Sequence, residues 1–149
     1  MAGIYDNFAD VVPLIVEKAR QQKKSMEKAS KRAAMDVFEG IVNDTPQDTG
    51  FLMSNWRVRR GRIGSMQTKK KIYKKNYKHR ISKVLANGID SIQKWDFGKE
   101  DLYFVNATEY ADIAEDIGWR YTPPYMMMKK NVAKLRDRLN YYLNMRAER

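Results

Sequence analysis

Cysteine is absent from the 149 residues of this chain, and histidine occurs only once, at position 79. The lack of cysteine excludes a disulfide framework and a thiolate metal site. A single histidine without a cysteine partner forms neither a metal site nor a nucleophilic triad. We therefore interpret His79 as a surface-loop residue, and we expect this chain to have no catalytic residues, no metal and no cofactor.

Long apolar runs are missing as well. No run in the sequence approaches the roughly 20 residues that a membrane-spanning helix needs. Residues 1–6 lack the basic and apolar regions of a signal peptide. We expect the protein to be made, and first used, in a cytoplasm. Charged residues make up 32% of the sequence and apolar residues 43%, which is typical of one globular domain with a modest core.

Acidic residues are missing from one long segment. Residues 57–83 contain 12 basic side chains and no acidic one, whereas residues 84–119 contain 2 basic and 8 acidic side chains. The net charge of +11 is therefore unevenly distributed along the chain. Such a distribution can steer head-to-tail assembly of copies as readily as it can attract nucleic acid.

A long helix is predicted over about Val12–Asn43, with Asp10 as its cap and Pro13 in its first turn. Its apolar face is marked by residues spaced three and four apart: Met26, Ala29, Ala33, Val37, Ile41. The basic residues that lie mostly off this face are expected in solvent: Lys23, Lys24, Lys28, Lys31, Arg32. At ~1.5 Å per residue the helix is ~48 Å long, more than this domain needs for its own core. We expect part of it to pack against another chain.

Shorter elements follow Pro46, which ends the long helix. Asp48-Thr49-Gly50 predicts a tight turn that can cap a helical turn over Phe51–Met53. Trp56–Arg59 alternates apolar and basic residues, as a half-exposed strand does, and Gly61 interrupts the pattern. A basic arm or loop is then predicted at about 62–83.

The remaining elements are short, apart from the last. A helix after the arm is predicted from the spacing of its apolar residues: Val84, Leu85, Ile89, Ile92. Leu102–Val105 is predicted as a buried strand, with Asn106 at its end. A short helix closed by Gly118 should bury one face, made of Tyr110, Ile113, Ala114 and Ile117.

The final helix is predicted to be capped by Thr122, with Pro123 in its first turn. Its expected apolar stripe comprises Met128, Val132, Leu135, Leu139 and Tyr142. The order of elements predicts a single α+β domain over residues 1–149. In this fold a small antiparallel sheet packs against the long N-terminal helix and a C-terminal helix.

Two clusters invite a catalytic interpretation. Three carboxylates, Asp112, Glu115 and Asp116, share the solvent side of the short helix, so we favour a solvated or interface surface over a catalytic pair. The Asp48-Thr49-Gly50 turn lacks the Gly-rich run and lysine of a nucleotide cradle. No constellation in the sequence supports an enzyme.

The basic arm leaves two interpretations open. Its lysines are interleaved with two tyrosines, which is typical of a segment that tracks a nucleic-acid backbone and stacks on bases. A solvated loop that pairs with acidic partners fits equally well. The residues concerned are Lys69, Lys70, Lys71, Tyr73, Lys74, Lys75, Tyr77 and Lys78.

Two blocks of sequence resemble the tail-completion or neck proteins of tailed bacteriophages, the minor tail proteins that join head to tail. The first runs from Thr45-Pro46 through Asp48-Thr49-Gly50 and Leu52 to Asn55-Trp56. Members of that family typically have a long N-terminal helix that ends in a Pro-x-Asp-Thr-Gly-x-Leu turn, followed by an aromatic strand.

The second block begins with the strand that ends at Asn106 and leads into the last helix. It comprises Leu102-Tyr103-Phe-Val-Asn106, Glu109-Tyr110-Ala111, Asp116-Ile-Gly118-Trp119 and Pro124-Tyr-Met126. The chain departs from the family pattern where Glu109 replaces a proline and Ile117 a tyrosine. The basic insertion after Gly61 is also longer than usual.

The resemblance implies a mechanical role in the virion, after assembly in the host cytoplasm. Six or twelve copies would form a ring at the end of the tail, through which DNA passes. The implied partners are further copies of the chain, a capsid connector or adaptor protein, and a tail-tube or terminator protein. We expect Trp56, Tyr110 and Trp119 to be packing anchors and the Lys69–Lys78 arm to become ordered on assembly. The alternative is a small basic nucleic-acid-binding module that uses the same arm.

Overall fold

The computed structural model describes residues 8–46, 50–64, 80–118 and 123–147. Predictions for His79, Thr122, Trp119, the Asp48-Thr49 part of the turn and the Lys69–Lys78 arm lie outside these residues. The described elements are α1 (Phe8–Asp44), α2 (Phe51–Ser54), β1 (Trp56–Arg60), α3 (Ile81–Gln93), β2 (Leu102–Asn106), the π-helix η2 (Ile113–Ile117), α4 (Met127–Val132) and α5 (Leu135–Ala147).

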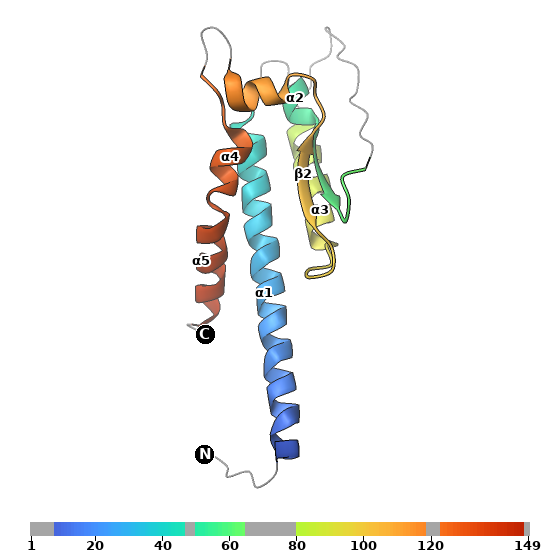
Figure 1. Cartoon of the computed structure of the whole chain (residues 1–149). Coiled ribbons are helices and arrows are strands. Elements are labelled where there is room, and N and C mark those ends of the chain that lie inside the picture. The colour runs from blue at the N-terminus through green and yellow to red at the C-terminus, as the bar shows by residue number, and fades with distance from the viewer. Residues whose placement is uncertain (1–7, 47–49, 65–79, 119–122, 148–149) are drawn as a thin grey trace.

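Helix α1 is the axis of the molecule (Figure 1). Its 37 residues span ~56 Å at ~1.5 Å per residue. Helices α4 and α5 run along one side of its C-terminal half, and α3 with the sheet lies on the other side. Strands β1 and β2 pair antiparallel, with Trp56 opposite Asn106 and Arg60 opposite Leu102. This confirms the predicted α+β fold of a small antiparallel sheet against long helices.

The core forms where α1 is covered on both sides. It contains Ala33, Val37 and Ile41 of the predicted apolar face, and its largest fully buried side chains are Phe38, Ile41, Met53, Ile92, Met127 and Val42. The ring of Phe38 stacks on that of Phe104 from β2, with 5.8 Å between centroids. Gly88 allows this ring to approach α3, because a Cβ at that position would overlap it.

The start of α1 differs from the prediction. The helix begins at Phe8, so Asp10 lies inside it and not at its N-cap position, and Pro13 lies beyond the first turn. Proline removes one backbone donor, and the loss is tolerated near a helix end, where several N–H groups have no intrahelical partner anyway. Lys31 also departs from expectation: it is half-buried and its Nζ donates to the carbonyl of Gln93, at 2.9 Å.

The arm prediction of about 62–83 is too long at its C-terminal end. Helix α3 begins at Ile81, so residues 81–83 belong to a helix. The apolar residues from which this helix was predicted face the core: Val84 and Ile92 are buried, and Leu85 packs against the core. Strand β2 is half-buried along its length rather than buried.

The predicted short helix before Gly118 is a π-helix. Gly118 donates its N–H to the carbonyl of Ile113, five residues earlier, at 2.7 Å. The wider turn rotates the expected face, so Ala114 is buried whereas Ile117 is 71% exposed. The prediction that Ile113 and Ile117 face the core is therefore wrong.

The predicted last helix is two helices. Residues 123–126 are held against η2 because Tyr125 donates its N–H to the carbonyl of Ala114, at 2.8 Å. Helix α4 therefore starts at Met127, after Met126 in a left-handed conformation, and not at Pro123. A turn at residues 133–134 then separates α4 from α5. Both changes shift the apolar stripe: Met127 is buried, whereas Val132 and Leu135 are exposed.

Candidate functional site

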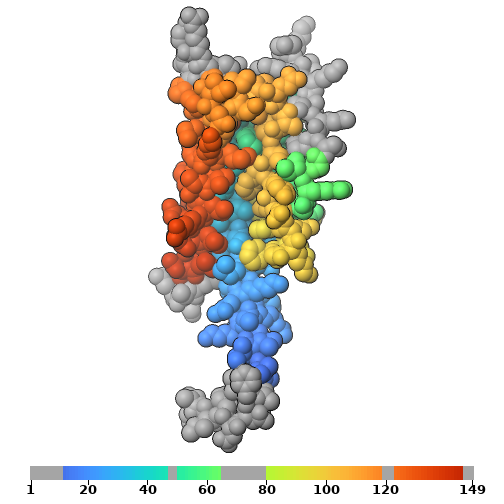
Figure 2. Space-filling view, viewed as in Figure 1, coloured from blue at the N-terminus to red at the C-terminus, as the bar shows by residue number. Residues whose placement is uncertain are grey.

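The N-terminal half of α1 stands apart from the rest of the molecule. Figure 2 shows it extending alone beyond the ends of α5 and of the sheet. Every residue from Val12 to Lys24 is exposed, including Ile15 at 54% and Val16 at 57%. These branched apolar side chains therefore face solvent in the isolated molecule.

The uncovered apolar residues continue the face that forms the core. Val12, Val16, Ala19 and Met26 follow one another at spacings of four, three and seven residues. Further steps of seven and four reach the buried Ala33 and Val37. Because residues spaced by three, four and seven lie on one side of a helix, these apolar residues share one side of α1 between Val12 and Val37, where Lys23 and Ser30 also lie. Only the C-terminal half of this side is covered within the chain.

The end of α5 marks the boundary between the two halves. An open hollow of about 520 Å³ lies there, and Leu143 of α5 and Met26 of α1 contribute its apolar walls. Its other lining residues, all from α1, are Lys18, Gln21, Gln22 and Ser25. The hollow therefore joins the covered face of α1 to the uncovered one.

Helix α5 is held to α1 just above this boundary by a cluster of three polar side chains. The hydroxyl of Tyr142 donates to the Asp36 carboxylate at 2.5 Å. The Arg32 guanidinium lies over the Tyr142 ring, 5.7 Å from its centroid. The hydrogen bond to Asp36, together with burial, raises the pKa of Tyr142 above its ordinary value.

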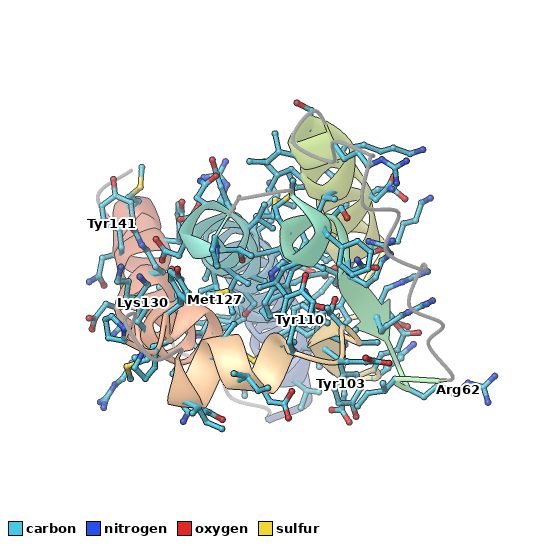
Figure 3. The ribbon with its side chains drawn as sticks, turned by 90° about the horizontal axis from the view of Figure 1, so that it is seen from above. Arg62, Tyr103, Tyr110, Met127, Lys130 and Tyr141 are labelled. Carbon is cyan, nitrogen blue, oxygen red and sulfur yellow. The ribbon has the colours of Figure 1, made fainter. Side chains whose placement is uncertain are left out.

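Two of the three expected packing anchors lie in the described chain. Trp56 is buried, and its Nε1 donates to the hydroxyl of Thr45 at 2.7 Å. That hydroxyl in turn donates to the carbonyl of Ile41 at 2.6 Å. Tyr110 is half-buried against the core, with its ring 6.4 Å from that of Phe51. Figure 3 shows Tyr110 near the middle of the molecule when it is seen from above.

The two sequence blocks with the phage resemblance lie side by side. Trp56 of the first pairs with Asn106 of the second across the sheet. The Asn106 side chain donates to the carbonyl of Leu52 at 2.8 Å and accepts the N–H of Thr108 at 3.1 Å. Asn106 thus connects α2, the sheet and the loop that follows β2.

The three carboxylates of the acidic helix have different surroundings. Asp112 is exposed, and Asp116 pairs with Lys129 at 2.5 Å. This pair raises the pKa of Lys129, chiefly through the hydrogen bond to Asp116. Glu115 is not solvated as expected: it is half-buried and accepts the N–H groups of Met128 and Lys129, at 2.8 to 3.1 Å.

Glu115 therefore caps the N-terminus of α4, where a negative charge is favourable. Sequence reasoning missed this role because the cap lies 13 residues before Met128. Local capping patterns place the acceptor within three residues of the N–H groups that it satisfies. The only signal was the unusually acidic segment just before a helix.

The buried residue Asn131 holds the other end of α4 in place. The Asn131 side chain donates to the carbonyl of Met127 and to the carboxylate of Asp44, both at 2.7 Å. Gly40 makes this approach possible, since a Cβ there would overlap the Asn131 side chain. These contacts fix α4 on the C-terminal end of α1.

Basic residues converge where α3 meets the α2–β1 junction. A pocket of about 200 Å³ is lined there by Ser54, Arg57, Arg80, Lys83, Val84 and Asn87. Burial lowers the pKa of Arg57, and the neighbouring charges of Arg59 and Arg80 lower it further. Figure 3 places Arg62, which follows β1, at the edge of the molecule opposite Tyr141 of α5.

Within the described ranges no three histidine, cysteine or acidic side chains are grouped so that they could hold a metal ion. Likewise, none of the helices in the part of the chain that the structure describes is long and apolar enough to cross a membrane. Comparisons with protein-family models, with curated proteins and with solved structures found no match.

Proposed function

We propose that this chain is a structural protein of the neck or tail of a tailed bacteriophage. In this proposal several copies, six or twelve, form a ring that completes the tail. The ring joins the tail tube or its terminator to the capsid connector or adaptor, and DNA passes through its centre. The chain acts through its surfaces and not as an enzyme.

The uncovered half of α1 carries the proposal. Isolated exposed apolar residues are ordinary on protein surfaces, but a contiguous stripe that extends the core marks an interaction surface. Val12, Val16 and Ala19 form such a stripe, and Met26 lies further along the same side of α1, beside the hollow below α5. A neighbouring copy that covered this stripe would bury side chains that the chain itself leaves in water.

The described surface carries charges of both signs. Arg59 and Arg62 are exposed on or just after β1, whereas Asp96 and Asp101 are exposed before β2 and Asp112 is exposed just before η2. Asp101 lies beside the basic end of β1, because Gly61 donates its N–H to the Asp101 carbonyl at 2.9 Å. Pairs of opposite charge between neighbouring copies would form a heterologous contact, which closes into a ring when the rotation between copies allows.

The connection between the two resembling blocks supports the phage assignment. Helix α2 and strand β1 of the first block are distant in sequence from strand β2 of the second, yet Asn106 pairs with Trp56 and bonds Leu52. The described residues of the two blocks around Asn106 are therefore in contact.

Binding to phage particles tests the proposal. Purified protein is mixed with tail-less heads and with tails that lack neck proteins, and the mixtures are examined by electron microscopy. The expected result is a ring of density at the end of one particle and joining of heads to tails. Failure to bind either particle, together with monomeric binding to duplex DNA that weakens steeply with salt, would replace the proposal with the nucleic-acid-binding module.

A further inference from the structure

The pocket beside α3 combines cationic side chains from two separate parts of the chain. Lys83, Val84 and Asn87 lie on one face of α3, since they are three and four residues apart, and Arg80 directly precedes this helix. Ser54 and Arg57 reach the pocket from the junction of α2 and β1. No carboxylate is among the lining residues, and the first turn of α3 has no acidic residue.

Arg57 is fixed in place by the backbone. Its Nη1 donates to the carbonyl of Ser54 at 2.7 Å and to that of Trp56 at 2.8 Å. Both bonds use the same nitrogen, so the N–H groups of Nε and Nη2 have no partner among the residues that the structure describes. A guanidinium held in this way loses little rotamer entropy when it binds an anion.

The electrostatics of the pocket favour an anion. Arg57 is partly removed from water, and Arg59 and Arg80 are close enough to disfavour its charged form. A bound negative charge would offset this mutual repulsion. The pocket volume of about 200 Å³ is below the roughly 300 Å³ at which pockets for whole small molecules begin, so it suits a single tetrahedral group.

We propose that this pocket binds one phosphate group, held by Arg57, Arg80 and Lys83. Phosphate fits better than a carboxylate because its oxygens accept bonds in several directions, whereas the donors here come from two sides. The phosphate group comes either from inorganic phosphate or from a phosphodiester of a nucleic-acid strand. The site does not depend on ring formation and goes beyond the proposed assembly role.

Titration of the full chain with sodium phosphate, in a chloride buffer of low ionic strength, tests the site by calorimetry. The pocket variants are Arg57→Gln and Lys83→Gln. Their matched controls are Arg136→Gln, which is exposed on α5 and outside the pocket, and Lys99→Gln, which is exposed elsewhere. Each pair removes the same charge. Lys83 is exposed, so its variant keeps the test valid if Arg57→Gln folds poorly.

Each pocket variant should weaken phosphate binding by about tenfold or more, because a charge-assisted hydrogen bond is lost. Each control should change it by less than about threefold, as expected for a screened charge outside the site. A wild-type protein that does not bind phosphate, or equal losses in a variant and its control, would overturn the proposal.

A second titration with a short DNA duplex identifies the source of the phosphate group. A larger loss of DNA affinity in Arg57→Gln than in Arg136→Gln, at one salt concentration, supports a nucleic-acid phosphodiester. Equal DNA affinities, alongside lost phosphate binding, support inorganic phosphate. Pocket variants that change only the mass of the assembly, with phosphate binding intact, would contradict the proposed role of these residues.

Discussion

The two halves of α1 have the same apolar periodicity but different surroundings. Ile41 is fully buried in the core, whereas Ile15, on the same helix, is 54% exposed. The chain supplies cover for one half and none for the other. Helical periodicity therefore shows which face will be buried but not which molecule buries it. In our account, the cover for the N-terminal half comes from another copy or a partner.

The largest expected effect comes from making the same substitution in both halves. Ile41→Ala should lower the free energy of unfolding by about 2–5 kcal/mol, because it leaves a cavity in the core. Ile15→Ala should change the stability of the monomer by less than about 0.5 kcal/mol, since the side chain is already in water. Chemical denaturation at low protein concentration measures both values.

Either substitution can contradict this account of the two halves of α1. A large loss of monomer stability in Ile15→Ala would mean that the N-terminal half of α1 packs within its own chain. A small loss in Ile41→Ala would mean that the covered half is not the core.

A smaller effect is expected at the boundary between the halves, where Tyr142 holds α5 to α1. Tyr142→Phe removes the hydrogen bond to Asp36 and should cost about 1 kcal/mol near neutral pH. The matched control is Tyr141→Phe, because Tyr141 is exposed and should contribute little.

The same bond predicts a dependence on pH. Folding raises the pKa of Tyr142 above its ordinary value of 10.0, so the folded protein keeps this proton at pH values where the unfolded chain loses it. The stabilisation is therefore complete below pH about 10 and is lost as the pH rises through the raised pKa. Unfolding curves of the wild type and Tyr142→Phe should converge above pH 10. A constant difference between them at all pH values would contradict this origin.

Much of the fold could be predicted because its signals are local. The apolar spacing of α1 and α3, the alternation in β1 and Gly50 before α2 each lie within a few residues of the element that they specify. The region after β2 could not be predicted in this way. Glu115 caps α4 from 13 residues away, and Asn131 bonds Asp44 from 87 residues away. These contacts decide where α4 begins and how it sits on α1, and no local pattern encodes them.

The candidate sites also differ in whether a local sequence signal or a long-range contact specifies them. The surplus length of α1 was predicted from its sequence, because helix length follows directly from the number of residues. The phosphate pocket was not, although the run of basic residues was plain. Arg57 was assigned to a strand, and Arg80 and Lys83 to the arm. Only the packing of α3 against the α2–β1 junction brings the three together.

The most direct test of the central claim is the mass of the protein in solution, measured by light scattering on the wild type and two variants. Val16→Glu places a charge on the uncovered stripe. Leu14→Glu places one on another side of the same helix turn, where Leu14 is similarly exposed, at 52%. We predict ring-sized assemblies for the wild type and Leu14→Glu, and smaller species for Val16→Glu. A wild type that stays monomeric at all concentrations, or equal masses for the two variants, would contradict the claim that this stripe joins copies of the chain.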